Sequence, residues 1–172
     1  MKTVLMLRHA KSSWEEPQLP DHQRPLAPRG KKAAPRIGFY MSDNGLLPDL
    51  VLCSPARRAM DTWALVSEQL GTLPEVKVLE DLYHTASGTV LALLHELPDS
   101  VNSVLLVGHN PTFEDLALSL SGTGDEESLA EMSRKYPTGA LAVIEFPVEE
   151  WRKVQPGAGS LRSFIRPRTL RP

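Results

Sequence analysis

The sequence contains almost no cysteine and no long hydrophobic run. Cys53 is the only cysteine among 172 residues, so an intramolecular disulfide is impossible and a reducing cytoplasm is the expected location. No apolar stretch approaches the roughly 20 residues that span a bilayer, and the apolar run over 3–7 is too short for the core of a signal peptide. We therefore expect a cytoplasmic protein that is not embedded in a membrane.

The motifs of common metal and nucleotide sites are also missing. The five histidines and the single cysteine show no HxH, HExxH or CxxC spacing, so we expect no metal site. Neither GxxxxGKS/T nor GxGxxG occurs, and a nucleotide-binding loop is therefore not supported. The formal net charge of −2 argues against nucleic acid as a partner. The sequence thus predicts chemistry without a cofactor.

Charge of each sign is unevenly distributed along the chain. Residues 1–40 carry eight Lys and Arg against three Asp and Glu, residues 41–150 carry five against eighteen, and residues 151–172 carry six against none. Solvated faces can produce such a pattern by chance. The basic tail from Arg152 to Arg171 has no predicted role.

Short apolar runs alternate with stretches of helical periodicity, a pattern typical of a mostly parallel sheet covered by helices on both faces. The chain of 172 residues is long enough for one globular domain over 1–172, and its 41% hydrophobic residues can form a core. We predict a three-layer α/β/α fold. The expected strands are 3–7, 50–53, 76–79, 103–107, 140–146, which can run antiparallel, and an edge strand over 161–165. The expected helices are 31–42, 59–70, 90–97, 113–120 and 128–135, with loops over 19–28 and 122–125.

Proline marks three of the expected helix starts. Pro35 must fall in the first turn of its helix to be tolerated. Ser54-Pro55 and Asn110-Pro111 each place a capping side chain before a proline at the first helical position. A strand followed by a helix N-terminus offers unpaired N–H groups to an anion. Ligands of open α/β folds bind at such turns, beyond the carboxyl ends of the strands.

Arginine and histidine occur together at three of these strand ends. Arg8-His9 follows the first strand and combines a guanidinium, which binds phosphate bidentately, with a potentially nucleophilic imidazole. Arg57 and Arg58 lie in the first turn of a helix, where the dipole disfavours cations unless an anion is bound. His109 follows a third strand. A parallel sheet brings such ends together, which predicts one phosphate site; the alternative is a solvated face on which an arginine pairs with Asp61.

Three elements of the sequence resemble, in order and spacing, those of the histidine phosphatase superfamily, the phosphoglycerate-mutase-like fold. They are Arg8-His9-Ala10, Ser54-Pro55-x-x-Arg58-Ala59-x-x-Thr62 and Gly108-His109. The short chain, the Arg24-Pro25-Leu26 segment followed by Gly30, and the lack of a large inserted cap resemble the SixA-type phosphohistidine phosphatase branch. The resemblance covers Met1 to about Phe146 and departs at Ala10, where the superfamily commonly has glycine.

The resemblance implies a role for each matching residue. His9 would be the nucleophile that becomes phosphohistidine, Arg8 and Arg58 would hold the phosphoryl oxygens, and His109 would donate a hydrogen bond to them. Positive charge and positioning can support phosphoryl transfer without a metal. His9 must be neutral with one nitrogen free, so we expect its other nitrogen to donate to a backbone carbonyl. Arg57, one residue off the motif, is the reserve candidate.

Relatives of this fold hold a carboxylic acid after the third strand, to protonate an alcohol leaving group. Asp81 matches this position better than the adjacent Glu80, and His84 is a further candidate; the choice stays open. A phosphoramidate depends less on a strong acid, because its ring nitrogen can already be protonated. The candidates for binding substrate at the entrance, or mouth, of the predicted phosphate site are Arg24 and Ser12.

Two neighbouring residues receive structural predictions. Trp14 is expected to be a lid or packing residue. Cys53 is expected to be a buried small hydrophobe, because the phosphate loop of a thiol phosphatase is missing around it.

These observations favour a metal-independent phosphatase that works through phospho-His9 on phosphohistidine in proteins. The alternatives are a phosphatase of small phosphate esters and a non-catalytic module that binds a phosphorylated partner. A mutase is less expected, because the chain lacks room for the insertions that such enzymes use. We further expect four arginines to converge on one pocket: Arg8, Arg24, Arg57 and Arg58.

Overall fold

The computed structural model describes residues 1–170, which form a seven-stranded sheet of order β3-β2-β4-β1-β6-β7-β5. Strands β1 to β4 run parallel, and β6 runs antiparallel to its neighbours β1 and β7. The predicted mostly parallel sheet and the antiparallel strand near 140–146 are therefore confirmed. The strands are β1 (Lys2–Arg8), β2 (Leu50–Cys53), β3 (Glu75–Val78), β4 (Ser103–Gly108), β5 (Ser121–Gly124), β6 (Leu141–Phe146) and β7 (Gly159–Ile165).

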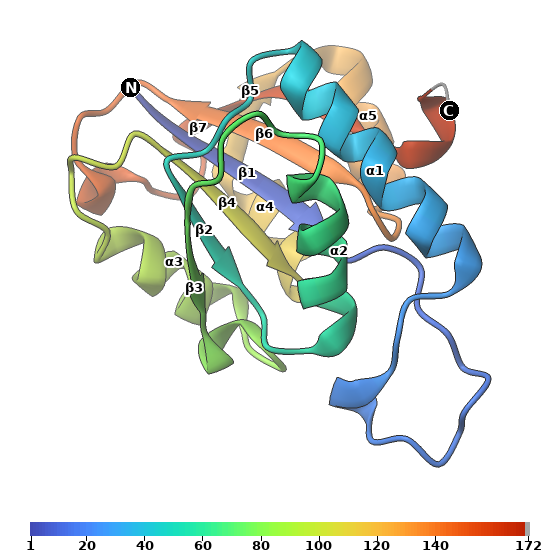
Figure 1. The fold of residues 1–172 in the computed structure, drawn as a ribbon. Helices are drawn as coiled ribbons and strands as arrows, with labels where there is room; N and C mark the ends of the chain where they lie inside the picture. The colour runs from blue at the N-terminus through green and yellow to red at the C-terminus, as the bar shows by residue number, and fades with distance from the viewer. Residues whose placement is uncertain (171–172) are drawn as a thin grey trace.

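Five helices cover the two faces of the sheet, as Figure 1 shows, with α1 and α2 on one side and the other three on the opposite side. Their bounds are α1 (Pro28–Asp43), α2 (Arg57–Ser67), α3 (Ser87–His95), α4 (Thr112–Leu120) and α5 (Glu126–Arg134). The 3₁₀ turns are η1 (Asp21–Gln23), η2 (Glu80–Leu82), η3 (Trp151–Lys153) and η4 (Pro167–Thr169). All five predicted helices are thus present. Within residues 1–170, none of the helices is long and apolar enough to cross a membrane.

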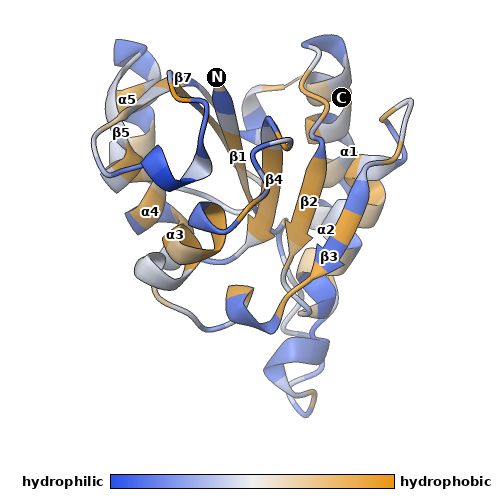
Figure 2. Cartoon of the chain, turned by 90° about the vertical axis from the view of Figure 1, so that its left-hand side faces the viewer, coloured by the Kyte–Doolittle hydropathy of each residue, from blue (hydrophilic) through white to orange (hydrophobic). Residues whose placement is uncertain are grey.

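Two hydrophobic cores result from the alternation of side chains along the strands. In β1, Val4 and Met6 pack toward α3, α4 and α5, whereas Leu5 and Leu7 pack toward α1 and α2. The central strands are buried on both faces, which explains their continuous apolar sequences. Figure 2 shows these hydrophobic strands between the helical layers, with the polar N-terminal loop extending beyond their ends. Because the cores fix β1, β2 and β4, the residues that follow them are held at one edge.

Two predictions for the C-terminal part of the sheet were wrong. The segment 122–125 was expected to be a loop, but most of it belongs to the edge strand β5, and the expected edge strand over 161–165 lies inside the sheet as β7. A Cβ at Gly122 would collide with the carbonyl oxygen of Gly157. The glycines that resemble a turn in the sequence therefore permit a close approach of backbones.

The predicted positions of the helix-start prolines were also wrong. Pro28 occupies the first position of α1, so Pro35 lies inside the helix and offers no N–H to the carbonyl of the preceding turn. Helix α2 begins at Arg57 after Ala56, rather than at Pro55. Ser54 does not cap it, because its hydroxyl oxygen accepts from Ala56 N in the preceding turn and bonds to a histidine ring.

The turn before α4 departs in the same way but keeps its cap. This helix begins at Thr112, with Pro111 before it rather than in the first helical position. Asn110 nevertheless supplies the predicted capping oxygen, because its Oδ1 accepts from Glu114 N at 3.2 Å. The side chain therefore stabilises the helix start from one residue further away than expected.

Candidate active site

The ends of β1, β2 and β4 bring the predicted histidine and serine turns together. The N–H of His9 donates to Gly108 O at 3.0 Å, and the N–H of Ser54 donates to Val107 O at 3.0 Å. As a result, the rings of His9 and His109 lie with their centroids 5.1 Å apart. The structure therefore assembles the three motif elements at one edge of the sheet, at residues far apart in the sequence.

His9 is fixed in one tautomer by its own backbone surroundings. Its Nδ1 lies 2.7 Å from Ala10 O, and because a carbonyl only accepts, Nδ1 carries the proton and Nε2 keeps its lone pair in the neutral ring. The side chain is buried, and this burial lowers the pKa of His9 to about 3, with the nearby His109 and Arg58 adding to the effect against the Ala10 bond. The expected hydrogen bond to a backbone carbonyl is present, and the ring is neutral at pH 7.

Thr62 ties the arginine motif of α2 to the end of β1. Its hydroxyl donates to Arg58 O one helical turn earlier, at 2.7 Å, and accepts from Ala10 N at 3.0 Å. The spacing between Arg58 and Thr62 thus places both residues on the helix face that meets the His9 segment. A small residue at Ala10, which is fully buried, fits this contact.

His109 faces His9 from the end of β4. Its Nε2 lies 2.7 Å from Ser54 Oγ, while its Nδ1 is buried without a hydrogen-bond partner among residues 1–170. Burial lowers the pKa of His109 to about 4, and the charge of Arg58 lowers it further. His109 is therefore also neutral at pH 7, with one ring nitrogen unpartnered.

Arg8 is anchored on the turn between α5 and β6. Its Nη1 donates to Tyr136 O at 2.9 Å, and Asn110 Nδ2 donates to the same oxygen at 3.0 Å. The hydroxyl of Tyr136 donates to Met6 O at 2.5 Å, which holds this turn against β1. In the described chain the buried Arg8 Nε has no partner, so this donor of the guanidinium remains available.

Asp21 is a functional-site candidate that the sequence reasoning missed. Its carboxylate lies 2.9 Å from Arg58 Nη2 and 3.1 Å from Arg24 Nη1, and it accepts a hydrogen bond from Tyr83 OH at 2.6 Å. Burial acts to raise the pKa of Asp21, but the hydrogen bonds from Tyr83 and Arg58 outweigh it and hold this pKa well below its usual range. The only local signal was an acidic residue three positions before Arg24.

Arg24 organises the proline-rich loop at the mouth. Its Nη2 donates to Ser12 Oγ at 2.5 Å, its Nε donates to Ser13 O at 3.2 Å, and its guanidinium stacks 3.2 Å from the centre of the Trp14 ring. The predicted packing role of Trp14 is therefore present, although the indole itself is 69% exposed. Both mouth candidates, Arg24 and Ser12, contact each other and are buried.

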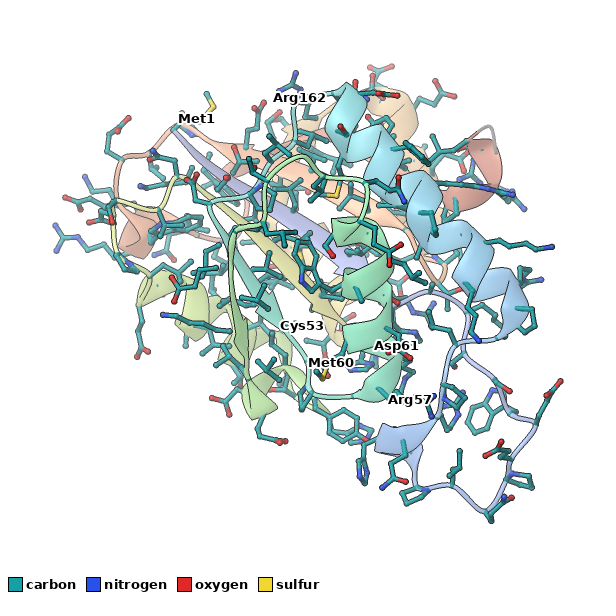
Figure 3. All side chains as sticks on the ribbon, viewed as in Figure 1. Met1, Cys53, Arg57, Met60, Asp61 and Arg162 are labelled. Carbon is teal, nitrogen blue, oxygen red and sulfur yellow. The ribbon has the colours of Figure 1, made fainter. Side chains whose placement is uncertain are left out.

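Three candidates are not brought into this cluster. Glu80 and Asp81 are exposed in η2, where the buried Leu82 is the inward-facing residue, and their carboxylates make no hydrogen bond or ion pair within residues 1–170. Arg57 is exposed and pairs with Asp61 at 3.5 Å along the outer side of α2 (Figure 3). The predicted convergence of four arginines is wrong for Arg57, because neighbouring helical residues point about 100° apart.

The two residues that follow η2 do reach the site. The ring centroids of Tyr83 and His109 lie 5.6 Å apart, and His84 Nε2 lies 3.6 Å from Asp21 Oδ2. His84 has a positive φ of 51°, which turns the chain sharply after Tyr83. The predicted third-strand segment therefore contributes an aromatic hydroxyl and an imidazole in place of its two carboxylates.

Cys53 lies inside the fold at the end of β2 (Figure 3). The thiol is buried, and burial raises its pKa to about 12. A protonated, enclosed thiol is a poor nucleophile. The prediction that Cys53 is a buried small hydrophobe is confirmed.

The sequence-family model that describes the histidine phosphatase superfamily (branch 1) matches residues 4–96 of this chain. An uncharacterized protein of Mycobacterium tuberculosis (strain H37Rv) is 38% identical over 164 residues, which cover 94% of this chain and 100% of the relative. An uncharacterized chloroplastic protein of Arabidopsis thaliana is 28% identical over 180 residues, which cover 96% of this chain and 78% of that protein.

Solved structures give the same result. The SixA structure from Agrobacterium tumefaciens superposes with a TM-score of 0.81 at 30% identity, covering 96% of this chain and 97% of its own. A structure of the protein histidine phosphatase SixA complexed with tungstate has the same fold, with a TM-score of 0.79 at 24% identity over 98% and 99% of the two chains. The resemblance seen in the sequence is confirmed, and the chain belongs to the histidine phosphatase superfamily, branch 1, as a SixA-type member.

Proposed function

We propose that this phosphatase removes phosphate from phosphohistidine on proteins, through a phosphorylated His9. The observation that carries the proposal is the state of His9: a buried, neutral ring with Nδ1 donating to Ala10 O and Nε2 free. A nitrogen lone pair in this arrangement is ready to attack phosphorus. We also propose a cytoplasmic location, on the evidence of the single reduced and buried Cys53.

The charges around His9 match a phosphoryl group. Arg8, Arg24 and Arg58 contribute three positive charges, Asp21 contributes one negative charge, and both histidines are neutral, which leaves two net positive charges. A phosphoramidate or phosphate monoester near pH 7 is close to a dianion. Fixed cations around the phosphoryl oxygens would stabilise the transition state without rearrangement. Among residues 1–170, Arg8 Nε and His109 Nδ1 are unpartnered, and we assign these two atoms to the phosphoryl oxygens, with the ring proton of His109 on Nδ1 and the Ser54 hydroxyl donating to Nε2.

In the proposed reaction, His9 Nε2 forms a bond to phosphorus while the bond to the nitrogen of the substrate imidazole breaks. The departing imidazole carries its own proton, and the phosphoryl group stays on His9. A water molecule then attacks the phosphorus, releasing inorganic phosphate and restoring the neutral ring. His9 Nδ1 remains bonded to Ala10 O throughout, which keeps the ring orientation fixed.

Among residues 1–170 no carboxylic acid of the cluster is protonated, which favours phosphohistidine over an alkyl phosphate ester. An alcohol leaving group needs a proton from the enzyme, whereas a protonated imidazole does not. Asp21 is ionised and already accepts a hydrogen bond from Tyr83, and the Glu80 and Asp81 carboxylates lie exposed on η2. Small phosphate esters are the alternative substrates, and they would require Glu80, Asp81 or His84 to supply the proton.

The decisive test compares a phosphohistidine peptide, p-nitrophenyl phosphate and glycerol 3-phosphate as substrates. We expect kcat/KM to be highest for the phosphohistidine peptide and lowest for glycerol 3-phosphate, whose alkoxide leaves worst. Glu80→Gln and Asp81→Asn should leave phosphohistidine turnover unchanged. Faster turnover of glycerol 3-phosphate, with collapse in one of these variants, would identify an esterase and its acid.

A second experiment separates an enzyme from a binding module. Alkaline trapping during turnover should show a phosphoryl group on His9, since phosphohistidine is labile in acid. Binding of the phosphopeptide without turnover of any substrate would establish a non-catalytic module. EDTA should not change the rate, and strong inhibition by EDTA would contradict a mechanism that relies on arginine and histidine alone.

A further inference from the structure

A cavity lies beside the catalytic cluster of Arg8, His9, Arg58 and His109 and has a different composition. It has a volume of about 680 Å³ and is formed by α1, the end of α5 with the turn that follows it, η4 and Lys11. In Figure 1 these elements lie on the side of the molecule where the C-terminus ends. None of Arg8, His9, Arg58 and His109 lines it. The cavity is therefore distinct from the catalytic cluster.

Its lining is strongly basic. Within residues 1–170, eight of the chain's 19 Lys and Arg residues line it, against one carboxylate, that of Glu131. These cations are Lys11, Arg29, Lys32, Arg36, Arg134, Lys135, Arg166 and Arg168. The chain as a whole has a net charge of −2, so this cavity concentrates positive charge that the rest of the surface lacks. Arg166 and Arg168 give part of the unassigned basic tail a position.

Most of these cations have no counter-charge. Glu131 pairs with Arg134 at 3.2 Å and with Arg166 at 3.0 Å, and the other six cations make no ion pair within residues 1–170. Arg29 and Lys32 lie in the first two turns of α1, where the helix dipole also disfavours positive charge. Lys32 and Arg36 are one turn apart and repel each other. An anion in the cavity would reverse the sign of all these terms.

We propose that this basic cavity binds a compact ligand that carries several phosphate groups. Five of its eight cations are arginines, whose guanidinium groups match phosphate oxygens bidentately. The eight cations converge from four segments around one concave space of a size typical of small-molecule sites, which favours a compact polyanion over an extended one. None of the described residues that line the cavity is aromatic, so the phosphates rather than a stacked base would be recognised.

The cavity and the catalytic cluster share two stretches of backbone. Lys11 is two residues beyond His9, and its backbone packs against Gly30 of α1 so closely that a Cβ there would collide with it. Pro137 and Thr138 follow Tyr136, whose carbonyl binds Arg8. Gly139 N donates to both Arg8 O and His9 O. The two sites are thus adjacent, with separate sets of side chains.

Isothermal titration calorimetry tests the proposal by measuring the affinity for inorganic tripolyphosphate, with orthophosphate as the comparison. We expect tripolyphosphate to bind the wild type far more tightly than orthophosphate. Lys32→Ala/Arg36→Ala should weaken this binding at least tenfold. The matched control Lys31→Ala/Lys77→Ala removes two exposed cations outside the cavity and should change it less than twofold.

Four outcomes would overturn the proposal. The first two are no binding of tripolyphosphate and an equal loss of affinity in both double variants. The third is a loss of affinity in His9→Ala/Arg58→Ala instead, which would place the ligand in the catalytic cluster. The fourth is tighter binding of a hexa-aspartate peptide, which would make an acidic polypeptide the occupant. Circular dichroism and turnover of p-nitrophenyl phosphate should be unchanged in Lys32→Ala/Arg36→Ala, which shows that the loss is not unfolding. Because the readout is binding, it remains valid even if the proposed phosphohistidine activity fails.

Discussion

The catalytic cluster and the basic cavity both attract anions, but they hold their cations in opposite ways. Arg58 is 6% exposed and bonded to Asp21 through two nitrogens, and Arg8 is anchored on Tyr136 O. In the cavity, six cations within residues 1–170 are held by no carboxylate. The first arrangement fixes the orientation of the guanidinium groups, which catalysis requires. The second supplies positive charge, which binding of an anion requires.

The largest expected effect is the loss of His9. His9→Ala should reduce phosphohistidine turnover by about 10⁴-fold or more, because the covalent route disappears with the nucleophile. Tripolyphosphate binding in the basic cavity should stay within twofold of wild type. His22→Ala is the control, because this histidine is exposed and lies outside both sites. Steady-state rates measure the effect, and retained turnover in His9→Ala would refute the mechanism.

Asp21→Asn tests whether the orientation of the arginines matters as much as the net charge of the site. The amide keeps the size of the side chain but removes the negative charge that pairs with Arg58 and Arg24, so both guanidinium groups are held less firmly. We expect kcat/KM to fall by about 10- to 100-fold, even though the site gains net positive charge. Asp61→Asn is the matched control, since its exposed pair with Arg57 contributes little. Increased activity of Asp21→Asn would mean that charge alone governs the reaction.

Arg57 and Arg58 also show what the sequence could and could not predict. The apolar runs and helical periods located the core strands and all five helices, because burial is encoded locally. The motif spacing located His9, Arg8, Arg58 and His109. It also ranked Arg58 above Arg57, but the expected convergence of four arginines still included Arg57, and only the structure shows Arg58 paired with Asp21 and Arg57 paired with the exposed Asp61.

Asp21 and β5 were missed for related reasons. Arg24 is the local partner of Asp21, but its other two partners, Arg58 and Tyr83, are 37 and 62 residues away in the sequence, and no local pattern connects them to it. The glycines of β5 resemble a turn, and only the approach of Gly157 reveals a strand. The basic cavity is the same case, because its cations come from four separate segments that only the fold brings together.

Truncating Arg58, whose charge is paired with that of Asp21, should destabilise the fold. Arg58→Ala removes a buried guanidinium with two hydrogen bonds to Asp21 and leaves Tyr83 as the nearest remaining partner of that carboxylate. We expect the free energy of unfolding to decrease by about 2 kcal/mol. Urea denaturation measures this change, and Arg57→Ala, which breaks only an exposed ion pair, should remain within about 0.5 kcal/mol of wild type. Equal effects of the two variants would show that burial of Arg58 contributes nothing.

The buried histidines of the catalytic cluster should make stability depend on pH. The pKa of His9 is lowered to about 3 and that of His109 to about 4, mainly by burial, whereas both rise to about 6.5 on unfolding. Between pH 6.5 and 4 the unfolded chain therefore binds protons that the folded chain does not, so stability decreases as the pH falls, by up to about 1.4 kcal/mol per pH unit for each histidine. Above pH 6.5 this contribution is fully present and constant.

Urea denaturation between pH 7 and pH 4.5 measures the slope in the range above most carboxylate titrations. Replacement of His109 by Gln should reduce the slope, whereas replacement of the exposed His22 should not. An unchanged slope in His109→Gln would show that this ring is not the source of the dependence.

The smallest effect concerns the uncompensated cations, and it has the opposite sign to that of Arg58→Ala. Lys32 and Arg36 lie one turn apart on α1 among other cations of the cavity, and like charges at this spacing destabilise a helix by about 0.2–0.5 kcal/mol. Lys32→Ala/Arg36→Ala should therefore be slightly more stable than wild type at low salt, and the gain should vanish at about 1 M salt, where the Debye length is about 3 Å. Saturating tripolyphosphate should reverse the order, because it stabilises only the chain that binds it. If the double variant were less stable than wild type at low salt, the cavity would be compensated by contacts like those of the catalytic cluster, and the difference between the two sites would disappear.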